Sequence, residues 1–123
     1  MSKSKAQGTA FESWLVQFFR DKGLQSSRFA EGGSKDIGDL WVDGFDDLFW
    51  VVEAKATEKL NVTRVLGKAI EKGGPRTVLI WKRLVKTGKK VRQSDGEKVV
   101  VVLSLDLFTT LLKSPSAVAD RDT

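Results

Sequence analysis

The chain has 123 residues, a length that fits one domain with a single hydrophobic core. It contains no cysteine and no histidine, which excludes disulfides, a thiol nucleophile, an imidazole base and the ordinary zinc sites. Any catalysis must therefore use carboxylates, lysine, hydroxyl groups or a metal ion such as Mg²⁺ that prefers oxygen ligands. The net charge of +5 favours a polyanionic partner, although a basic protein without such a partner has the same composition.

The N-terminal part predicts a flexible basic arm over residues 1–7 and then a helix. Thr9 and Glu12 match a capping box, in which the Glu12 side chain bonds back to the Thr9 amide. The alternative role for Glu12 is at a metal site, as a ligand or just outside the ligands. Gly23 ends the helix, whose apolar stripe has helical period: Phe11, Trp14, Leu15, Phe18 and Phe19.

Three strands are expected next, over residues 24–30, 37–42 and 48–57. The first carries Arg28, and the third is long and apolar enough to be central. Between the first two lies the Gly- and Ser-rich segment 31–35. Such a loop could clamp a nucleic-acid backbone, or it could be only a connection.

Asn61 is a plausible N-cap for a second helix, which the Gly-Gly-Pro run at residues 73–75 closes. The apolar stripe of this helix faces the core, so its basic residues are expected to form a solvated ridge: Arg64, Lys68 and Lys72. Residues 77–84 form a fourth strand, which suits a parallel position after a helix crossover. Lys82 and Arg83 stand at its far end.

Residues 86–98 are the most basic stretch and predict a protruding loop or irregular hairpin suited to phosphate contact. Residues 99–105 are nearly all apolar, and we expect a fifth strand buried on both faces. Asp106 can cap a last helix that ends at residue 112. The polar residues 113–123 predict a flexible tail.

The candidate site lies on the third strand. Glu53 and Lys55 are two residues apart, so they project from the same side of the strand. Turn residues separate them from Asp39, which predicts that Asp39 and Glu53 lie on adjacent antiparallel strands. Two carboxylates with the Ala54 carbonyl suit Mg²⁺, and Lys55 could reach a phosphate or an attacking water. The structural alternative is an exposed acid and base paired on an amphipathic strand.

These residues together resemble the PD-(D/E)XK nuclease superfamily, and most closely its Holliday junction resolvases of the archaeal and phage type. The resemblance covers residues 8–112, here the predicted nuclease domain. The features that carry it are the predicted order α-β-β-β-α-β, Glu12 on the first helix, Arg28 on the first strand, the Gly- and Ser-rich loop at residues 31–35, Gly38-Asp39-Leu40, and Val52-Glu53-Ala54-Lys55. The resemblance implies an α/β fold of the restriction-endonuclease type, with a mixed central sheet of about five strands, flanking helices and the core order α-β-β-β-α-β.

The resemblance also implies roles for particular residues. Asp39 and Glu53 would hold Mg²⁺ or Mn²⁺, Glu12 would complete the metal site, and Lys55 would serve catalysis. Arg28 and Ser34 would face the DNA, and the further candidate DNA contacts are basic: Lys35, Lys82, Arg83, Lys89 and Lys90. The usual proline before the aspartate is Gly38 here, which leaves Asp36 as a rival to Asp39.

The implied partners are four-way DNA junctions and a second copy of the chain, because resolving a junction requires two symmetric cuts. The dimer contact could use Trp41, Phe45, Phe49 and Trp81, which could equally be core residues. No stretch is apolar over the ~20 residues of a membrane span, so we expect no membrane partner and a cytoplasmic location, that of the host if a phage encodes the protein. The competing functions are another endonuclease of the superfamily, acting on duplex or flapped DNA, and a non-catalytic basic DNA-binding module.

Overall fold

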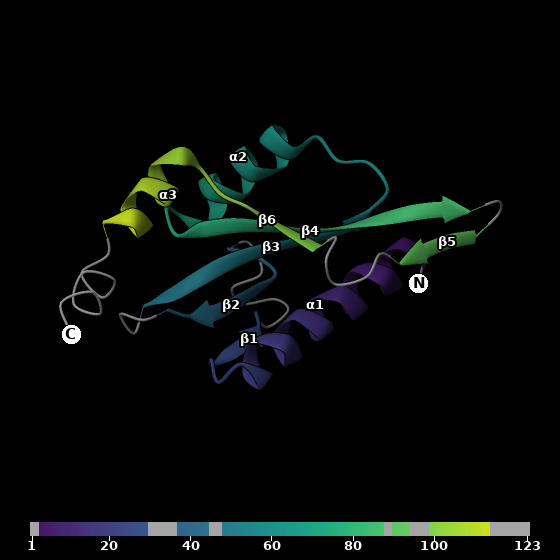
Figure 1. Cartoon of the computed structure of the whole chain (residues 1–123), viewed down its shortest axis with the longest axis horizontal. Coiled ribbons are helices and arrows are strands. Elements are labelled where there is room, and N and C mark those ends of the chain that lie inside the picture. The colour runs from purple at the N-terminus through teal and green to yellow at the C-terminus, as the bar shows by residue number, and fades with distance from the viewer. Residues whose placement is uncertain (1–2, 30–36, 45–47, 88–89, 94–98, 114–123) are drawn as a thin grey trace.

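The structure is a computed structural model that describes residues 3–29, 37–44, 48–87, 90–93 and 99–113 (Figure 1). The described elements follow one another as α1 (Lys3–Asp21), β1 (Ser26–Arg28), β2 (Leu40–Asp43), β3 (Phe49–Thr57), α2 (Val62–Gly73), β4 (Thr77–Thr87), β5 (Lys90–Gln93), β6 (Val99–Val102) and α3 (Leu105–Leu112). The predicted fold class is confirmed, since a mixed sheet is flanked by helices and the chain begins α-β-β-β-α-β. All five predicted strands are present, and β5 is an additional one within the basic stretch.

The described strands form one six-stranded sheet around β3 and β4. β1 pairs with β2 and β2 with β3, both antiparallel, so Leu40 lies opposite Val52. β3 and β4 are parallel and are connected through α2, as the sequence predicts. Both β5 and β6 pair with β4 in the antiparallel sense, β5 opposite residues 84–87 and β6 opposite residues 79–82.

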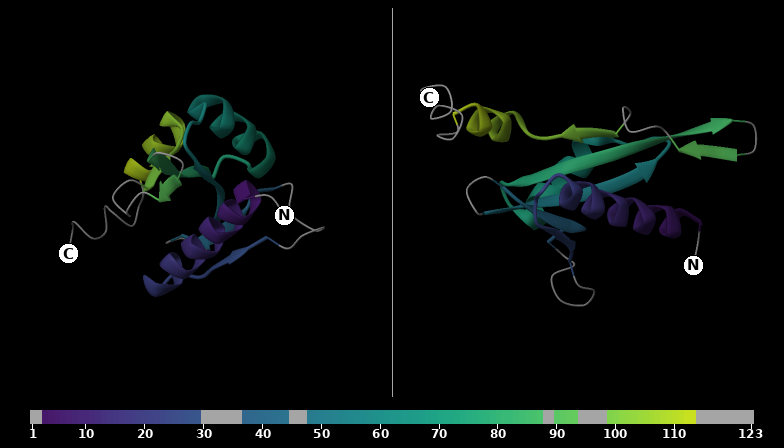
Figure 2. Two further views of the ribbon diagram at one scale, coloured as in Figure 1. Left: turned by 90° about the vertical axis from the view of Figure 1, so that its right-hand side faces the viewer. Right: turned by 60° about the horizontal axis from the view of Figure 1, so that its bottom comes forward.

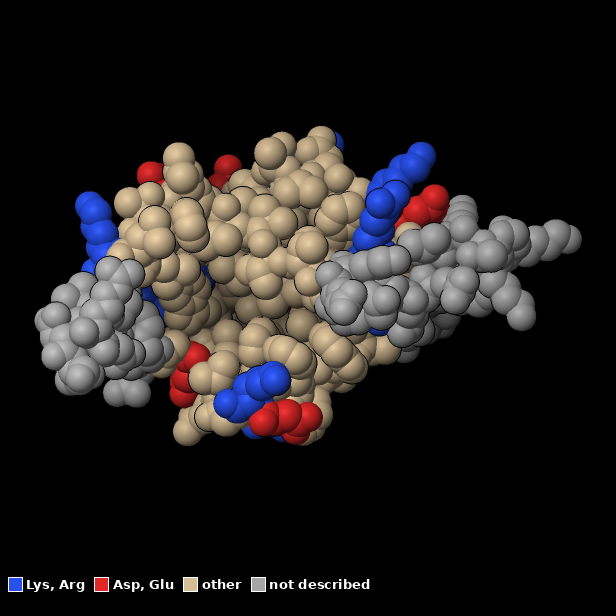
Figure 3. Space-filling view, in the orientation of Figure 1, with Lys and Arg blue, Asp and Glu red and all other residues tan. Residues whose placement is uncertain are grey.

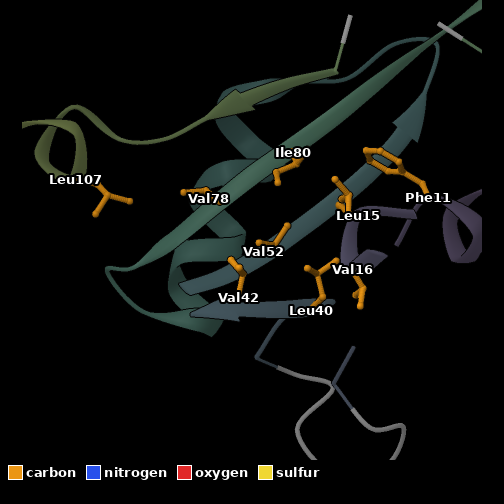
Figure 4. Close-up of a cluster of buried hydrophobic side chains, with 10 residues drawn as sticks. Phe11, Leu15, Val16, Leu40, Val42, Val52, Val78, Ile80 and Leu107 are labelled. Atoms are coloured by element: carbon orange, nitrogen blue, oxygen red, sulfur yellow. The ribbon is translucent and has the colours of Figure 1, made fainter. Parts of the chain in front are cut away.

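α1 and α2 cover opposite faces of the sheet (Figures 1 and 2). The main core lies between α1 and the sheet, where side chains from β2, β3 and β4 meet those of the helix, and Leu107 of α3 lies at the far end of the cluster beyond Val78 (Figure 4). Its buried members are Phe11, Leu15, Val16, Leu40, Val42, Val52, Ala54, Val78, Ile80 and Leu107. On β3, this face takes Val52 and Ala54, so strand alternation directs Glu53 and Lys55 to the face that carries α2.

The helix boundaries agree with several sequence signals. Asn61 caps α2 by accepting a hydrogen bond from the Arg64 amide, as predicted. Gly74 ends α2 at a φ of 91°, in the left-handed region that favours glycine, and Gly23 ends α1 in the same way at 89°. Within the described residues, no helix has both the length and the apolar character needed to cross a membrane.

The predicted start of the first helix is wrong. α1 begins at Lys3, so residues 3–7, predicted as part of a flexible arm, are helical and Thr9 lies inside the helix instead of capping it. The Glu12 carboxylate accepts a hydrogen bond from Arg28 Nε at 3.1 Å. A local capping pattern cannot reveal this partner, because Arg28 approaches only through the folding of β1 against α1.

Two predictions near the C-terminus are also wrong. β6 is not buried on both faces, since Val100 is 43% exposed and Val101 is 56% exposed. The reason is its position, because β4 is the one strand of the described chain that pairs with it. The cap of α3 is Ser104, whose hydroxyl accepts from the Leu107 amide at 3.0 Å, and Asp106 lies in the first helical turn.

Candidate active site

Asp39 makes two hydrogen bonds to the middle of β3 and one to the residue that follows β1. Its amide donates to the Val52 carbonyl at 3.0 Å, and its carbonyl accepts from the Phe29 amide at 3.1 Å. Its carboxylate Oδ2 accepts from the Ala54 amide at 2.9 Å. Ala54 lies between Glu53 and Lys55 in the chain, so this last bond brings the Asp39 carboxylate to the part of β3 that carries both, close enough to raise the pKa of Glu53. The predicted convergence of Asp39 with β3 is therefore present in the structure.

Glycine at position 38 permits this approach. A Cβ at Gly38 would collide with Val51 Cγ1 and would lie 3.3 Å from the Val52 carbonyl oxygen. Proline also carries a Cβ, so the residue expected before the aspartate from the resemblance would not fit this packing. Gly38 thus brings Asp39 close to β3, and the departure from the expected motif has a steric reason.

The bond between Asp39 and Ala54 predicts different effects for two substitutions. Asp39→Ala leaves the Ala54 amide without its acceptor and is expected to lower the free energy of unfolding by about 1–3 kcal/mol. Asp39→Asn keeps a side-chain oxygen that can accept the bond, so we expect a smaller loss. Urea denaturation of the two variants and the wild type measures the free energy of unfolding of each. Equal stabilities of the two variants would contradict the role of this hydrogen bond.

Glu53 and Lys55 form an ion pair on the α2 face of the sheet. Lys55 Nζ lies 3.5 Å from Glu53 Oε1, which confirms that the two side chains project from one side of β3. The Glu53 side chain is 11% exposed, whereas that of Lys55 is 39% exposed. The carboxylate is therefore sheltered, and the ammonium group remains accessible to a ligand from solvent.

The pKa values of both glutamates of the site are raised, and burial is the largest cause in each case. Burial raises the pKa of Glu53, and the Asp39 carboxylate raises it further, against the opposing charges of Lys55 and Lys72. Burial likewise raises the pKa of Glu12, with added repulsion from Asp39 and a smaller one from Glu53, while Arg28 opposes the rise. The Asp39 carboxylate thus repels both glutamates, and a bound cation would relieve this repulsion.

The raised pKa of Glu53 predicts how stability depends on pH. A carboxyl group whose folded-state pKa lies above its unfolded value favours folding at low pH, and this contribution is lost as pH rises through the folded pKa. We therefore expect Glu53→Gln to be more stable than the wild type at pH 7 in EDTA. The advantage should shrink as pH falls toward the ordinary carboxyl range. Urea titrations of both proteins at several pH values measure this difference in stability. A difference that does not change with pH would contradict a raised pKa of Glu53.

Glu12 enters the site from α1. Its side chain is 17% exposed and pairs with Arg28, which is 40% exposed, at 3.1 Å. Glu12 therefore orients Arg28 at the margin of the site and stays within electrostatic range of Asp39 and Glu53. The pairing fits a position just outside the metal ligands, one of the two roles the sequence leaves open.

The donor set fits a hard divalent cation. Asp39 and Glu53 supply carboxylate oxygens, and Ala54 between Glu53 and Lys55 supplies a carbonyl. Mg²⁺ commonly binds through one or two protein carboxylates and keeps several waters. Within the described residues, no group of three or more acidic side chains is arranged to hold a metal ion, so further ligands would come from water and substrate.

Lys72 is a basic residue of the site that the sequence does not reveal. The sequence predicts Lys72 on a solvated ridge, and the side chain is indeed exposed. It nevertheless lies near enough to the site for its charge to lower the pKa of Glu53. The end of α2 lies close to the segment before Asp39, since a Cβ at Gly73 would lie 2.8 Å from the Ile37 carbonyl oxygen. Helical periodicity places Lys72 away from the core of its own helix but cannot show which strand the helix end meets.

The candidate DNA contacts lie in different places. Arg28 borders the site through Glu12. Arg83 is exposed opposite Thr57 of β3, and alternation puts it on the same face as Lys55. Lys82 projects to the other face, where its ammonium lies 5.8 Å from the centre of the Phe11 ring. Lys90 opens β5, and four positions lie outside the described residues: Ser34, Lys35, Asp36 and Lys89.

The aromatic residues considered for a dimer contact differ in how far they are exposed to solvent. The Phe49 ring is half exposed and makes edge contacts with Trp41 and Phe29. Trp81 is partly buried and donates from Nε1 to the carbonyl and hydroxyl oxygens of Thr57. Phe45 lies outside the described residues.

The fold and the site together define a small α/β protein in which Glu53 and Lys55 lie on the central strand β3 and the carboxylate of Asp39, from the segment before β2, is hydrogen-bonded to the same strand. Comparison with protein-family models and with curated proteins finds no match for the chain. A function is therefore inferred from the geometry and charges of the site.

Proposed function

We propose that the protein is a metal-dependent DNA endonuclease that resolves four-way junctions by phosphodiester hydrolysis. The observation that carries the proposal is the hydrogen bond from the Ala54 amide to the Asp39 carboxylate. It brings an acid from outside β3 to the point between Glu53 and Lys55. The arrangement agrees with the residue roles implied by the resemblance to the PD-(D/E)XK nucleases.

Phosphodiester hydrolysis requires an activated water and compensation for the negative charge that grows on the phosphate. Mg²⁺ or Mn²⁺ bound at Asp39 and Glu53 would supply a Lewis acid and lower the pKa of a bound water. Lys55 would stabilise the negative charge or orient the water, because its ammonium is partly exposed beside Glu53. Arg28, held by Glu12, and Lys72 would place further positive charge near the phosphate.

The excess of basic residues supports DNA as the partner, through contacts to the phosphate backbone. A four-way junction has two-fold symmetry, and two copies of the chain would place one active site at each of two equivalent strands. We propose a homodimer that acts in the cytoplasm, or in the host cytoplasm if the protein is phage-encoded.

The test compares labelled substrates under one set of conditions with Mg²⁺: an immobile four-way junction, a flapped duplex and a linear duplex of matched sequence. The proposal predicts paired nicks at symmetric positions in the junction and little cutting of the linear duplex. Preferential cutting of flap or linear duplex would support a different endonuclease of the same superfamily. Binding to all three without a nick on any would indicate a non-catalytic DNA-binding module.

A further inference from the structure

The structure has an exposed apolar face that the proposed nuclease site does not use. It is formed by the edge of β6 and the outer side of α3, and we call it the β6–α3 face. Its members are Val100, Val101, Leu105, Phe108 and Leu112, whose exposed fractions are 43%, 56%, 78%, 47% and 65%. Val100 and Val101 are neighbours on β6, so they project to opposite sides of the sheet and flank the open edge of the strand from both sides. Figure 3 shows the side of the molecule that carries β6, with a broad uncharged area at its centre and the visible charged side chains toward its margins.

The apolar residues of α3 are partly buried and partly exposed. Leu107 is buried in the main core, and Leu111 is partly buried one turn further on. Leu105, Phe108 and Leu112 follow the helical spacing i, i+3, i+7 on the exposed side. Asp106, Thr109 and Thr110 form the polar side of the helix. The apolar side is therefore wider than the part that the core covers, and Leu105, Phe108 and Leu112 remain exposed in the described chain.

β6 presents an open edge next to this helix. In the part of the chain that the structure describes, no strand other than β4 pairs with β6. The strand is Val-Val-Val-Val, without the charged residue or proline that usually protects an exposed edge from pairing. Two residues, Leu103 and Ser104, separate β6 from α3, so the open edge and the apolar helix side are close in the fold.

We propose that the β6–α3 face is the interface between two copies of this chain, with β6 paired antiparallel to β6 of the second copy. In a dimer with a two-fold axis, the same surface of each copy contacts the other copy. A strand of four valines can pair with its own copy in this way, because each valine meets another valine. The two sheets would then join into one, and the outer sides of both α3 helices would pack nearby. The inference rests on surface and edge properties and does not require nuclease activity.

Other occupants fit the face less well. Nucleic acid or an anionic membrane surface would require basic side chains, and the members of the face are all apolar. The segment at residues 114–123 has Val118 as its one large apolar residue, so it offers little apolar surface with which to cover α3. A second copy carries the same net charge of +5, so an uncharged face is where two copies approach with least repulsion.

The size of the face also suits a stable dimer. Its five side chains expose roughly 500 Å² of apolar surface, against about 800 Å² that each partner contributes to a typical stable interface. Homodimer interfaces are about 65% apolar, so a face of this area with a polar rim has the expected composition.

The first experiment measures the mass of the full chain by sedimentation equilibrium, with no DNA present. We expect twice the chain mass of 13.6 kDa at micromolar concentration. Leu105→Glu with Val101→Lys should raise the dimer dissociation constant at least a hundredfold, and both side chains are exposed enough for the monomer to fold. Leu48→Glu is the matched control, because Leu48 is 57% exposed beside the aromatic group at Phe49, and it should leave the dimer intact.

Cross-linking gives a second readout, because the chain has no native cysteine. Cysteine is placed in turn at each of the four valines of β6, and oxidation should link two copies in at least one variant, since paired strands bring Cβ atoms within disulfide range. Leu48→Cys should not form the link.

Three outcomes would overturn the interface: a monomeric wild type, a dimer that survives Leu105→Glu with Val101→Lys, or a dimer that Leu48→Glu dissociates. A monomer is also the result expected if the C-terminal segment or another protein covers the face. The mass is independent of cleavage, so a dimer without nuclease activity would refute the proposed function and leave this inference standing.

Discussion

Glu53→Gln is expected to reduce Mg²⁺-dependent cleavage of a four-way junction by at least about a thousandfold, since it removes one of the two carboxylates proposed to hold the cation. The substitution is nearly isosteric, and the carboxylate it replaces is sheltered and crowded by Asp39, so the fold should be retained. Asp39→Asn is expected to lose activity in the same way while keeping its acceptor for the Ala54 amide. Single-turnover cleavage of a labelled junction measures both effects.

The matched control for these variants is Glu71→Gln, which neutralises an exposed acid on α2. It should cut the junction at the wild-type rate. Junction binding, measured in Ca²⁺ or EDTA by fluorescence anisotropy, should be largely retained in every variant, because the change removes acidic and not basic charge. Retained cleavage in both Glu53→Gln and Asp39→Asn would refute the site.

Lys55→Ala is expected to lower the cleavage rate by about 10²–10⁴-fold, the range for a positioned group that assists proton transfer or stabilises charge in the transition state. The pH profile should also move. Lys55 lowers the pKa of Glu53, so its loss raises that pKa further, and the residual activity should require a higher pH for the ionised carboxylate. Rates measured across pH 5–9 with a fixed Mg²⁺ concentration test both parts.

Lys68→Ala is the control for Lys55→Ala, because it removes the same charge from an exposed position on α2. It should reduce junction binding slightly at low salt and leave the pH profile unchanged. An equal loss of cleavage in Lys55→Ala and Lys68→Ala would show that Lys55 contributes only general positive charge. Full activity in Lys55→Ala would contradict its proposed role.

Much of the fold is accessible from local sequence patterns. The apolar stripe that includes Phe11 and Leu15 predicts α1, Asn61 marks the start of α2, and the apolar beginning of β4 predicts its parallel pairing with β3. These features depend on helical period, capping and crossover geometry, which act over short distances along the chain. The order α-β-β-β-α-β follows from them.

The errors arise where long-range contacts decide the structure. Glu12 has a local capping pattern, but Arg28 engages it from β1. Residues 99–102 are as apolar as a central strand, yet they form an edge strand. The composition of a strand does not determine its position in the sheet, because that position depends on which other strands pair with it. An apolar edge of this kind can also reflect burial against a second copy, which the proposed interface would supply.

In the candidate site too, local patterns predict some features, and contacts between distant parts of the chain determine the others. The spacing of Glu53 and Lys55 is sufficient to place both on one side of β3, and the ion pair confirms it. The position of Asp39 depends on Gly38, whose missing side chain admits Val51, and no local rule assigns glycine there a steric role of this kind. Lys72 reaches the site through the packing of α2, which helical periodicity alone cannot specify.

The most direct test of the proposed site is the metal dependence of junction cleavage by the wild-type chain. An immobile four-way junction, labelled in turn on each strand, is incubated with the protein in Mg²⁺ and in EDTA. We predict paired symmetric nicks in Mg²⁺ and none in EDTA, with activity restored when Mg²⁺ or Mn²⁺ is added in excess of the chelator. Equal nicking in EDTA, or intact junctions under every metal condition, would contradict a cation-dependent nuclease site at Asp39 and Glu53.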